Sequence, residues 1–215
     1  TMFSCKDNNS GPAISEIELI EPSFDQLLEL YRKYVKEGTE KAWQDSKNSQ
    51  FTHFDDYDSK TVFTPSASES SAGVAPIMRN YLVPVYPSSS PKQDEKMTTA
   101  SASFTPGEYE PVQIAIKAVK ELNNCEARIS SELPVGLSAE VFQVECVPMR
   151  TAGGSSSKKW HIQPNRLWPA SIFPTCSVKA CEAQAWWVIF KADDKLKAGK
   201  YPVVVDILSD KKVLI

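Results

Sequence analysis

The chain has 215 residues, enough for one good-sized domain or for a smaller domain with an arm. Its 41% hydrophobic and 24% charged residues are ordinary for a globular protein, and a net charge of −3 argues against a general nucleic-acid binder. No apolar run approaches the roughly 20 residues that a membrane-spanning helix needs, so we expect no such segment.

The N-terminal residues resemble the processing site of a bacterial lipoprotein. Cys5 follows Met2, Phe3 and Ser4 and is itself followed by a polar run from Lys6 to Ser10. In such proteins a cysteine after small residues is lipidated, and a polar tether follows it. The apolar segment that normally precedes this cysteine is not in the chain, so a stray cysteine in a frayed terminus stays open as the alternative.

The first predicted element is a helix that begins at Ser23. Ser23 and Gln26 have the spacing of a capping box, and Asp25 suits the positive end of the helix dipole. The apolar stripe at helical spacing is Phe24, Leu27, Leu28, Tyr31 and Val35. Gly38 is expected to end or bend the helix, with a restart over residues 39–45. Because an isolated helix of this length is only marginally stable, we expect it to dock on the rest of the chain.

Residues 47–73 lose this periodicity and are expected to form a loop. The acidic cluster at residues 55–58 lacks the glycine and the distal glutamate of an EF-hand, so solvated surface charge is favoured over a cation site. Residues 66–73 have the composition of a linker. Residues 74–86 return to extended chain interrupted by prolines, which predicts an edge strand or a strap lying across a sheet.

A turn at residues 105–108, Thr-Pro-Gly-Glu, introduces the clearest strand of the chain. Proline presets φ at one central position and glycine accepts a positive φ at the next, which is typical of a type II turn. Apolar side chains then alternate over residues 112–118, which predicts a strand with one buried face. A short strand is also expected over residues 98–104, so that the turn would join a hairpin.

Further short strands follow, separated by turns. They are expected at residues 125–130, 140–148, 183–191, 201–207 and 213–215. Residues 183–191 are apolar on both faces, which predicts a central strand and offers an outer surface on which the N-terminal helix can dock. Because the last strand is incomplete, we expect the chain to be part of a longer protein.

These strands predict a mainly β fold for most of the chain. Turn signals at short intervals, without alternation of strands and helices, favour an immunoglobulin-like sandwich of two antiparallel sheets. We assign residues 76–215 to this β-sandwich. Residues 1–75 would form an N-terminal tether and a helical arm that docks on it, with a further domain of the longer protein as the alternative docking partner.

The remaining cysteines are Cys125, Cys146, Cys176 and Cys181. Four cysteines allow three connectivities, and the sequence cannot choose among them. Buried free thiols are the favoured interpretation, because isolated cysteines in strands are commonly small buried hydrophobes. A local bridge between Cys176 and Cys181 comes second. A zinc site, which would need closer spacing, is a distant third.

No set of catalytic residues stands out in the sequence. It has no nucleophile elbow, zinc-protease or phosphate-loop motif, and neither His53 nor His161 has a ligand neighbour at a suitable spacing. We therefore predict no catalytic residue, no metal and no cofactor. The candidate carbohydrate-binding residues are Trp160, Trp168 and Trp186, because exposed indoles can stack on sugar rings, although packing is the favoured role for each of them.

Three segments in a fixed order resemble the N-terminal β-sandwich of certain secreted bacterial glycoside hydrolases. They are Thr105–Val112 (TPGEYEPV), the aromatic residue just before Val188–Phe190, and Leu196–Val203 (LKAGKYPV). In β-N-acetylgalactosaminidase-type enzymes and related uncharacterised families, a similar turn introduces a strand and a similar tyrosine segment closes the sandwich. The resemblance covers about residues 79–215 and does not extend to the helical arm.

The resemblance implies a non-catalytic accessory domain that supports the catalytic barrel of an exported carbohydrate-active enzyme. The catalytic carboxylates of those enzymes belong to the barrel, so none is assigned to this chain. The implied partners are the catalytic domain of the parent protein and a carbohydrate, and the implied location is the periplasm or the cell surface, with Cys5 as the lipid anchor. A free-standing carbohydrate-binding or adhesion module of the cell surface is the alternative.

Overall fold

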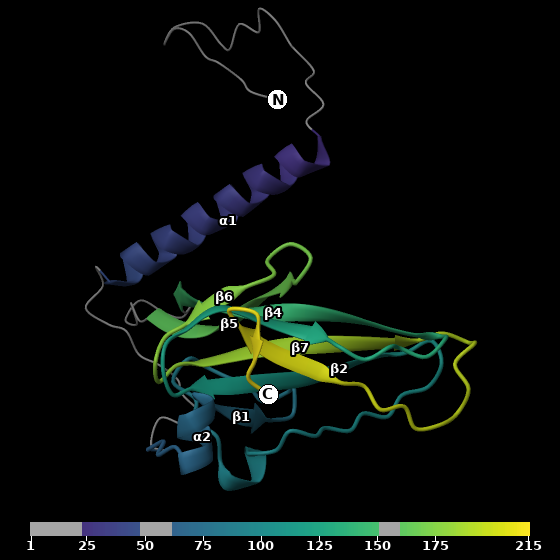
Figure 1. The fold of residues 1–215 in the computed structure, drawn as a ribbon. Helices are drawn as coiled ribbons and strands as arrows, with labels where there is room; N and C mark the ends of the chain where they lie inside the picture. Colours follow the sequence, from purple (N-terminus) through teal and green to yellow (C-terminus); the bar gives the residue numbers. More distant parts are fainter. Residues whose placement is uncertain (1–22, 48–61, 151–159) are drawn as a thin grey trace, which may run out of the picture. The chain divides into compact units, whose positions relative to one another are not determined.

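The computed structural model describes residues 23–47, 62–150 and 160–215 (Figure 1). The chain divides into two compact units, Thr1–Gly38 and Thr39–Ile215, and each is described by itself. The second unit holds the β domain that the sequence predicts.

Helix α1 spans Phe24–Lys47 and begins as predicted after Ser23. The backbone N–H of Ser23 donates to Gln26 Oε1 at 3.0 Å, and the N–H of Gln26 donates to Ser23 Oγ at 3.3 Å, which is the reciprocal pair of a capping box. Of the two outcomes expected at Gly38, the end of the helix is wrong. The helix continues through it, since glycine inside a helix costs only about 1 kcal/mol relative to alanine. Among the described residues, no helix is long and apolar enough to cross a membrane.

Two antiparallel sheets pack face to face in the second unit, which confirms the predicted sandwich. The five-stranded sheet has the order β1-β2-β7-β4-β5, and the four-stranded sheet has the order β6-β3-β8-β9. The strands are β1 (Val74–Met78), β2 (Tyr109–Ala118), β3 (Leu122–Ile129), β4 (Leu137–Arg150), β5 (Trp160–Pro169), β6 (Cys176–Val178), β7 (Ala183–Ala192), β8 (Val205–Ser209) and β9 (Lys212–Val213). The short helices are α2 (Ala67–Ala72) and the 3₁₀ helix η1 (Gln93–Glu95).

The core between the two sheets is built from alternate residues of the facing strands. Ile116 and Trp186 enter it from the five-stranded sheet, and Cys125 and Ile207 enter it from the four-stranded sheet. Burial of apolar area at roughly 25 cal/mol per Å² makes this core the main source of stability. Strand β7 lies at the centre of its sheet and is apolar on both faces, as predicted.

Residues 74–86, predicted as an edge strand or a strap, are both in turn: Val74–Met78 is the edge strand β1, and the residues after it belong to a strap, residues 79–96, which covers the outer face of the five-stranded sheet. Val85 of the strap packs in a second apolar cluster with Ala185 of β7. The ring of Tyr81 meets Trp187 edge-on, with the ring centroids 5.8 Å apart. The five-stranded sheet is therefore buried on both faces along its central strands.

The strap corrects two expectations. Strand β2 was predicted to have one buried face, but Gln113 and Lys117, which point away from the sandwich core, are each only 4% exposed. The outer face of β7, on which we expected the N-terminal helix to dock, is occupied by Val85 and Tyr81 instead. Docking of that helix elsewhere on the sandwich stays a prediction.

The turn before β2 has the predicted type II form. Gly107 has a φ of 88°, and the N–H of Glu108 donates to Thr105 O at 3.1 Å. The predicted hairpin is wrong, because residues 98–104 form no strand. Strand β2 already pairs with β1 on one side and β7 on the other, and the N–H of Gly107 itself bonds to Ala192 O at the end of β7.

Two of the other differences from the predictions concern residues 66–73 and the strand near Tyr201. Residues 66–73, expected to be a linker, contain α2, which has a complete capping box involving Glu69. The strand predicted to begin at Tyr201 begins at Val205, where pairing with β3 starts. Tyr201 lies outside the sheet and turns back, so that its hydroxyl donates to Lys197 O at 2.7 Å.

Candidate functional site

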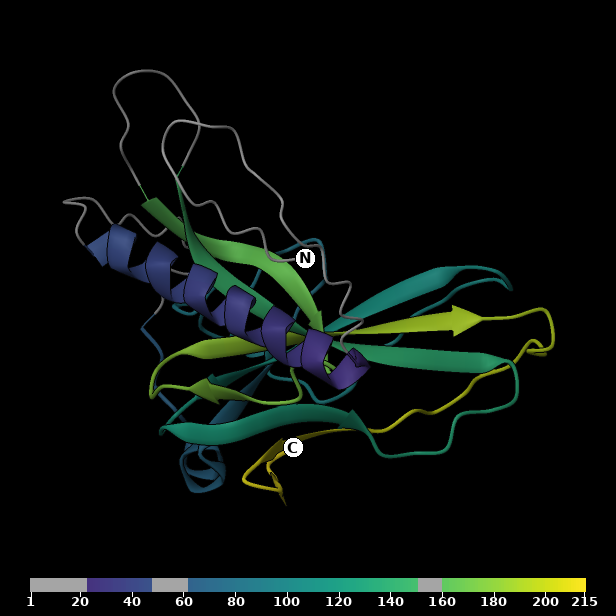
Figure 2. The ribbon, with the colours of Figure 1, turned by 90° about the horizontal axis from the view of Figure 1, so that it is seen from above.

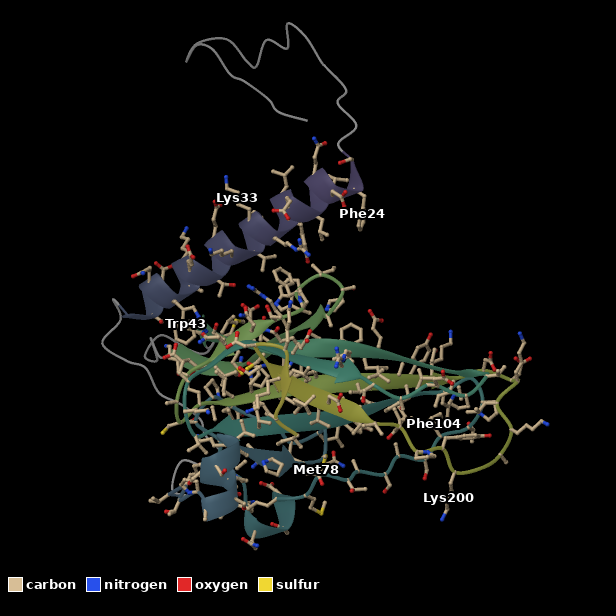
Figure 3. All side chains as sticks on the ribbon, viewed as in Figure 1. Phe24, Lys33, Trp43, Met78, Phe104 and Lys200 are labelled. Carbon is tan, nitrogen blue, oxygen red and sulfur yellow. The ribbon has the colours of Figure 1, made fainter. Side chains whose placement is uncertain are left out.

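Three loops meet at one end of the sandwich. This loop end comprises residues 104–108, 130–136 and 193–204, as Figures 1 and 2 both show. The N–H of Asp193 donates to Gly136 O at 2.8 Å and joins two of the loops. Figure 3 labels Phe104 and Lys200 at this end. The turn before β2 and the segment before β8, which are two of the three segments on which the expected family resemblance rests, therefore lie at the same end of the sandwich.

Large apolar side chains are exposed at or next to the loop end. Val135 is 82% exposed, Tyr109 is 62% exposed and Val204 is 52% exposed. The ammonium group of Lys191 lies 5.1 Å from the centroid of the Tyr109 ring, a cation–π distance. This end of the molecule thus combines exposed apolar side chains with charged side chains of both signs.

Trp168, one of the three tryptophan candidates, is held in a polar cluster on strands β4 and β5. Its indole N–H donates to Glu145 Oε2 at 2.7 Å, and Arg166 Nη1 donates to the same oxygen at 3.1 Å. The guanidinium carbon of Arg166 lies 5.8 Å from the Trp168 ring centroid, and the Phe173 ring packs at a centroid distance of 4.8 Å. The half-buried indole is therefore fixed in orientation, as a platform for a planar or sugar ligand requires.

The strand register explains how this cluster forms. Glu145 lies opposite Arg166 and Gln143 lies opposite Trp168, so the four side chains share one face of the β4–β5 pair. A bulge follows directly, because β5 has one extra residue, Asn165, where the register shifts. Gln143 Oε1 is buried and has no hydrogen-bond partner in the described part of the chain. No pattern within either segment signals this cross-strand pairing.

The other two tryptophan candidates lie elsewhere. Trp186 is 1% exposed within the sandwich core, so its indole has no face available to a ligand. Trp160 lies at the first position of β5, opposite Arg150, and Trp168 lies near the other end of that strand. The three tryptophans therefore do not form one site. The candidates that lie outside the described residues are Cys5, His53 and residues 55–58.

The strap carries a buried polar layer that the sequence analysis did not predict. Arg79 binds Glu95 in a two-pronged ion pair, with Nε to Oε1 at 2.8 Å and Nη2 to Oε2 at 2.7 Å. Arg79 Nη1 also donates to Pro84 O at 3.2 Å, and Lys117 Nζ of β2 donates to Ser88 O at 3.2 Å. These bonds tie the strap to itself and to the sheet.

The pKa values of two carboxyl groups, Glu95 in the strap and Glu69 on α2, lie below their ordinary value. Burial alone would raise the pKa of Glu95, but the hydrogen bonds from Arg79 and from a backbone N–H outweigh it and hold that pKa below 4.5. Burial likewise opposes ionisation of Glu69, yet Lys96, at 2.8 Å, and the cap of α2 hold its pKa below 4.5. Each carboxylate is matched by a cation, which points to a structural role.

The four described cysteines are free thiols. Cys146 lies beneath the strap with its sulfur 3.8 Å from Val85 O, and burial raises its pKa to about 12. Cys125 and Cys176 face the sandwich core on the other side of the five-stranded sheet. Cys181 is exposed, with a positive φ of 65°. Cys146 is thus separated from Cys125 and Cys176 by the five-stranded sheet.

Within residues 23–47, 62–150 and 160–215, no group of three or more His, Cys, Asp or Glu side chains is placed to hold a metal ion. No protein-family model matches the chain, and a search of curated proteins finds no match either. The loop end and the Trp168 cluster are therefore the features of the described residues that bear on function.

Proposed function

We propose that this chain is the non-catalytic N-terminal accessory part of an exported bacterial carbohydrate-active enzyme, and that its sandwich packs on the catalytic domain through the loop end. One observation carries the proposal. Two of the three segments that resemble the accessory sandwich of glycoside hydrolases lie at that end, where the side chains of Val135 and Tyr109 are exposed. Apolar side chains exposed in this way favour contact with another protein surface.

The backbone at the loop end is rigid enough to present such a surface. Gly136 has a φ of 88°, and a Cβ there would lie 2.5 Å from a side-chain oxygen of Asp193 and from the backbone nitrogen of Leu196. The turn is therefore packed directly on the neighbouring loop, and it holds Val135 at the outside. Loops fixed on a rigid scaffold are the usual carriers of binding residues.

The test uses the parent protein and its catalytic domain produced as a separate chain. We expect the sandwich to bind that domain, and Val135→Glu to weaken binding by tenfold or more, which corresponds to about 1.4 kcal/mol. Val62→Glu is the matched control, because Val62 is an equally exposed valine outside the loop end. Binding that is absent, or that both substitutions leave unchanged, would refute the proposal. So would a parent reading frame that stops shortly after Ile215.

A second function is favoured by one observation, the oriented and partly exposed indole of Trp168. A free-standing carbohydrate-binding module would use it as a stacking platform beside Arg166 and Glu145. Calorimetric titration with soluble polysaccharides tests this alternative. Binding that Trp168→Ala abolishes and that Leu167→Ala, at the exposed neighbouring position, preserves would support the binding module over the accessory domain.

A further inference from the structure

The pairing of β3 with β6 places two cysteines opposite each other. Leu122 pairs with Val178, and after a register shift Cys125 pairs with Cys176. The shift arises because β3 carries one extra residue at this point, where Asn124 adopts a positive φ of 48°. As a result, Leu122 and Cys125 both point into the core although three positions separate them.

Directly opposed residues on antiparallel strands have the geometry that a disulfide needs. Their Cα atoms lie about 4.5 Å or about 5.5 Å apart, depending on the hydrogen-bonding position. Both values fall within the range of about 4.4–6.8 Å that disulfides span. The Cys125 and Cys176 side chains also contact the same core cluster, so they point toward the same space.

We propose that Cys125 and Cys176 form a cross-strand disulfide when the chain meets an oxidant of the disulfide class, such as oxidised glutathione or a disulfide-carrying protein. The thiolate of one cysteine attacks a sulfur of the oxidant and gives a mixed disulfide, and one half of the oxidant leaves as a thiolate. The second cysteine then displaces the other half. The protein thiols lose two electrons and two protons, and the oxidant is reduced to two thiols.

The position of the pair determines when it can react. Cys125 is fully buried, and burial raises the pKa of both thiols, so few thiolates form in the closed sandwich. Cys176, however, lies on β6, a strand of three residues at the edge of its sheet. Local opening of this edge, or the time before it pairs during folding, exposes both sulfurs. The bond would then connect this edge strand covalently to β3.

The other thiols are poorly placed to compete. Cys146 faces the strap on the opposite side of the five-stranded sheet. Cys181 is the alternative partner for Cys176, because only a short turn separates the two. Its side chain is exposed, whereas that of Cys176 packs against the core. The structure thus favours the distant cysteine, Cys125, over the nearby one.

Peptide mapping of the whole chain distinguishes these pairings. The protein is incubated with oxidised glutathione under native conditions, its free thiols are alkylated in denaturant, and it is digested with trypsin without reductant. Trypsin cleaves after Lys179 and therefore separates Cys176 from Cys181. We expect the peptide Glu121–Arg128 linked to Leu167–Lys179, and a protein lighter by two hydrogen atoms before digestion.

Two variants complete the test. Cys181→Ser should leave the linked peptides in place, whereas Cys176→Ser should abolish them and leave the Cys125 peptide alkylated. Two outcomes would overturn the proposal: alkylation of both Cys125 and Cys176 after oxidation, or a link between Leu167–Lys179 and Ala180–Lys191. The result does not depend on the proposed function, because the isolated chain and the oxidant suffice.

Discussion

The ion pair between Arg79 and Glu95 offers the sharpest test of how the strap is held. In Glu95→Ala, the guanidinium of Arg79, whose side chain is 3% exposed, stays buried without its carboxylate. Removal of one member of a buried pair typically costs about 3–5 kcal/mol. Since Arg79 keeps its bond to Pro84 O, we expect a loss near the lower end, about 3 kcal/mol. This is a large share of the roughly 5–15 kcal/mol that stabilises a typical domain.

Urea unfolding followed by tryptophan fluorescence measures this loss, with Trp187 beneath the strap as a local reporter. Glu182→Ala is the matched control, because its ion pair with Lys179 is 4.0 Å long and exposed on both sides. We expect that control to lose less than about 1 kcal/mol.

A double variant separates the buried charge from the loss of packing. In Arg79→Met/Glu95→Leu no charge is left unpaired, so most of the stability should return. A loss below about 1 kcal/mol in Glu95→Ala, or a loss equal to that of the exposed control, would refute the argument that a matched buried charge holds the strap.

Other measurable properties are the pH dependence of this ion pair, the cost of a Cβ at two glycines and the burial of two aliphatic side chains. Burial alone would raise the pKa of Glu95, but the hydrogen bonds that its carboxylate accepts hold this pKa below 4.5. The carboxylate therefore contributes to the free energy of unfolding above pH 4.5, and this contribution is lost as the pH falls through the lower pKa of the folded state. The free energy of unfolding should accordingly fall less on acidification in Glu95→Ala than in the unmodified chain. Gly107→Ala should lower the free energy of unfolding by about 1–2 kcal/mol, because alanine is strained at a φ of 88°. Gly136→Ala should lower it further, because the new Cβ would also clash with the backbone of Leu196. Equal melting temperatures of the two variants would contradict this order. In the same urea assay, Ile114→Ala should lower the free energy of unfolding by about 2–4 kcal/mol, because Ile114 is buried in the core. Val203 lies outside the strands, so Val203→Ala should lower it by less than about 1 kcal/mol. A larger loss in Val203→Ala than in Ile114→Ala would contradict this assignment of the core.

Local features of the sequence were sufficient for much of the fold. The capping box at Ser23, the type II turn at Gly107 and the two-sided strand β7 each depend on residues within a few positions of one another. Their conformations follow from backbone sterics and from the two- or 3.6-residue repeat of buried side chains. The sandwich class followed from the number and spacing of such strands.

The candidate site depended on contacts that no local window contains. Trp168 and Trp186 are the same residue type in similar strands. One is held half-exposed by Glu145 and Arg166, and the other is sealed in the core. The two residues differ in position, because Trp186 lies on the central strand β7 and Trp168 lies on the edge strand β5.

The strap and the cysteine pair were likewise decided by tertiary structure. Gln113 and Lys117 have the polarity of a solvent face and are buried because residues 79–96 cross above them. Cys125 meets Cys176 because a bulge shifts the register of β3 by one position. Strand order, register and coverage are set by the free energy of the whole packed chain, so residues far apart in sequence determine them together.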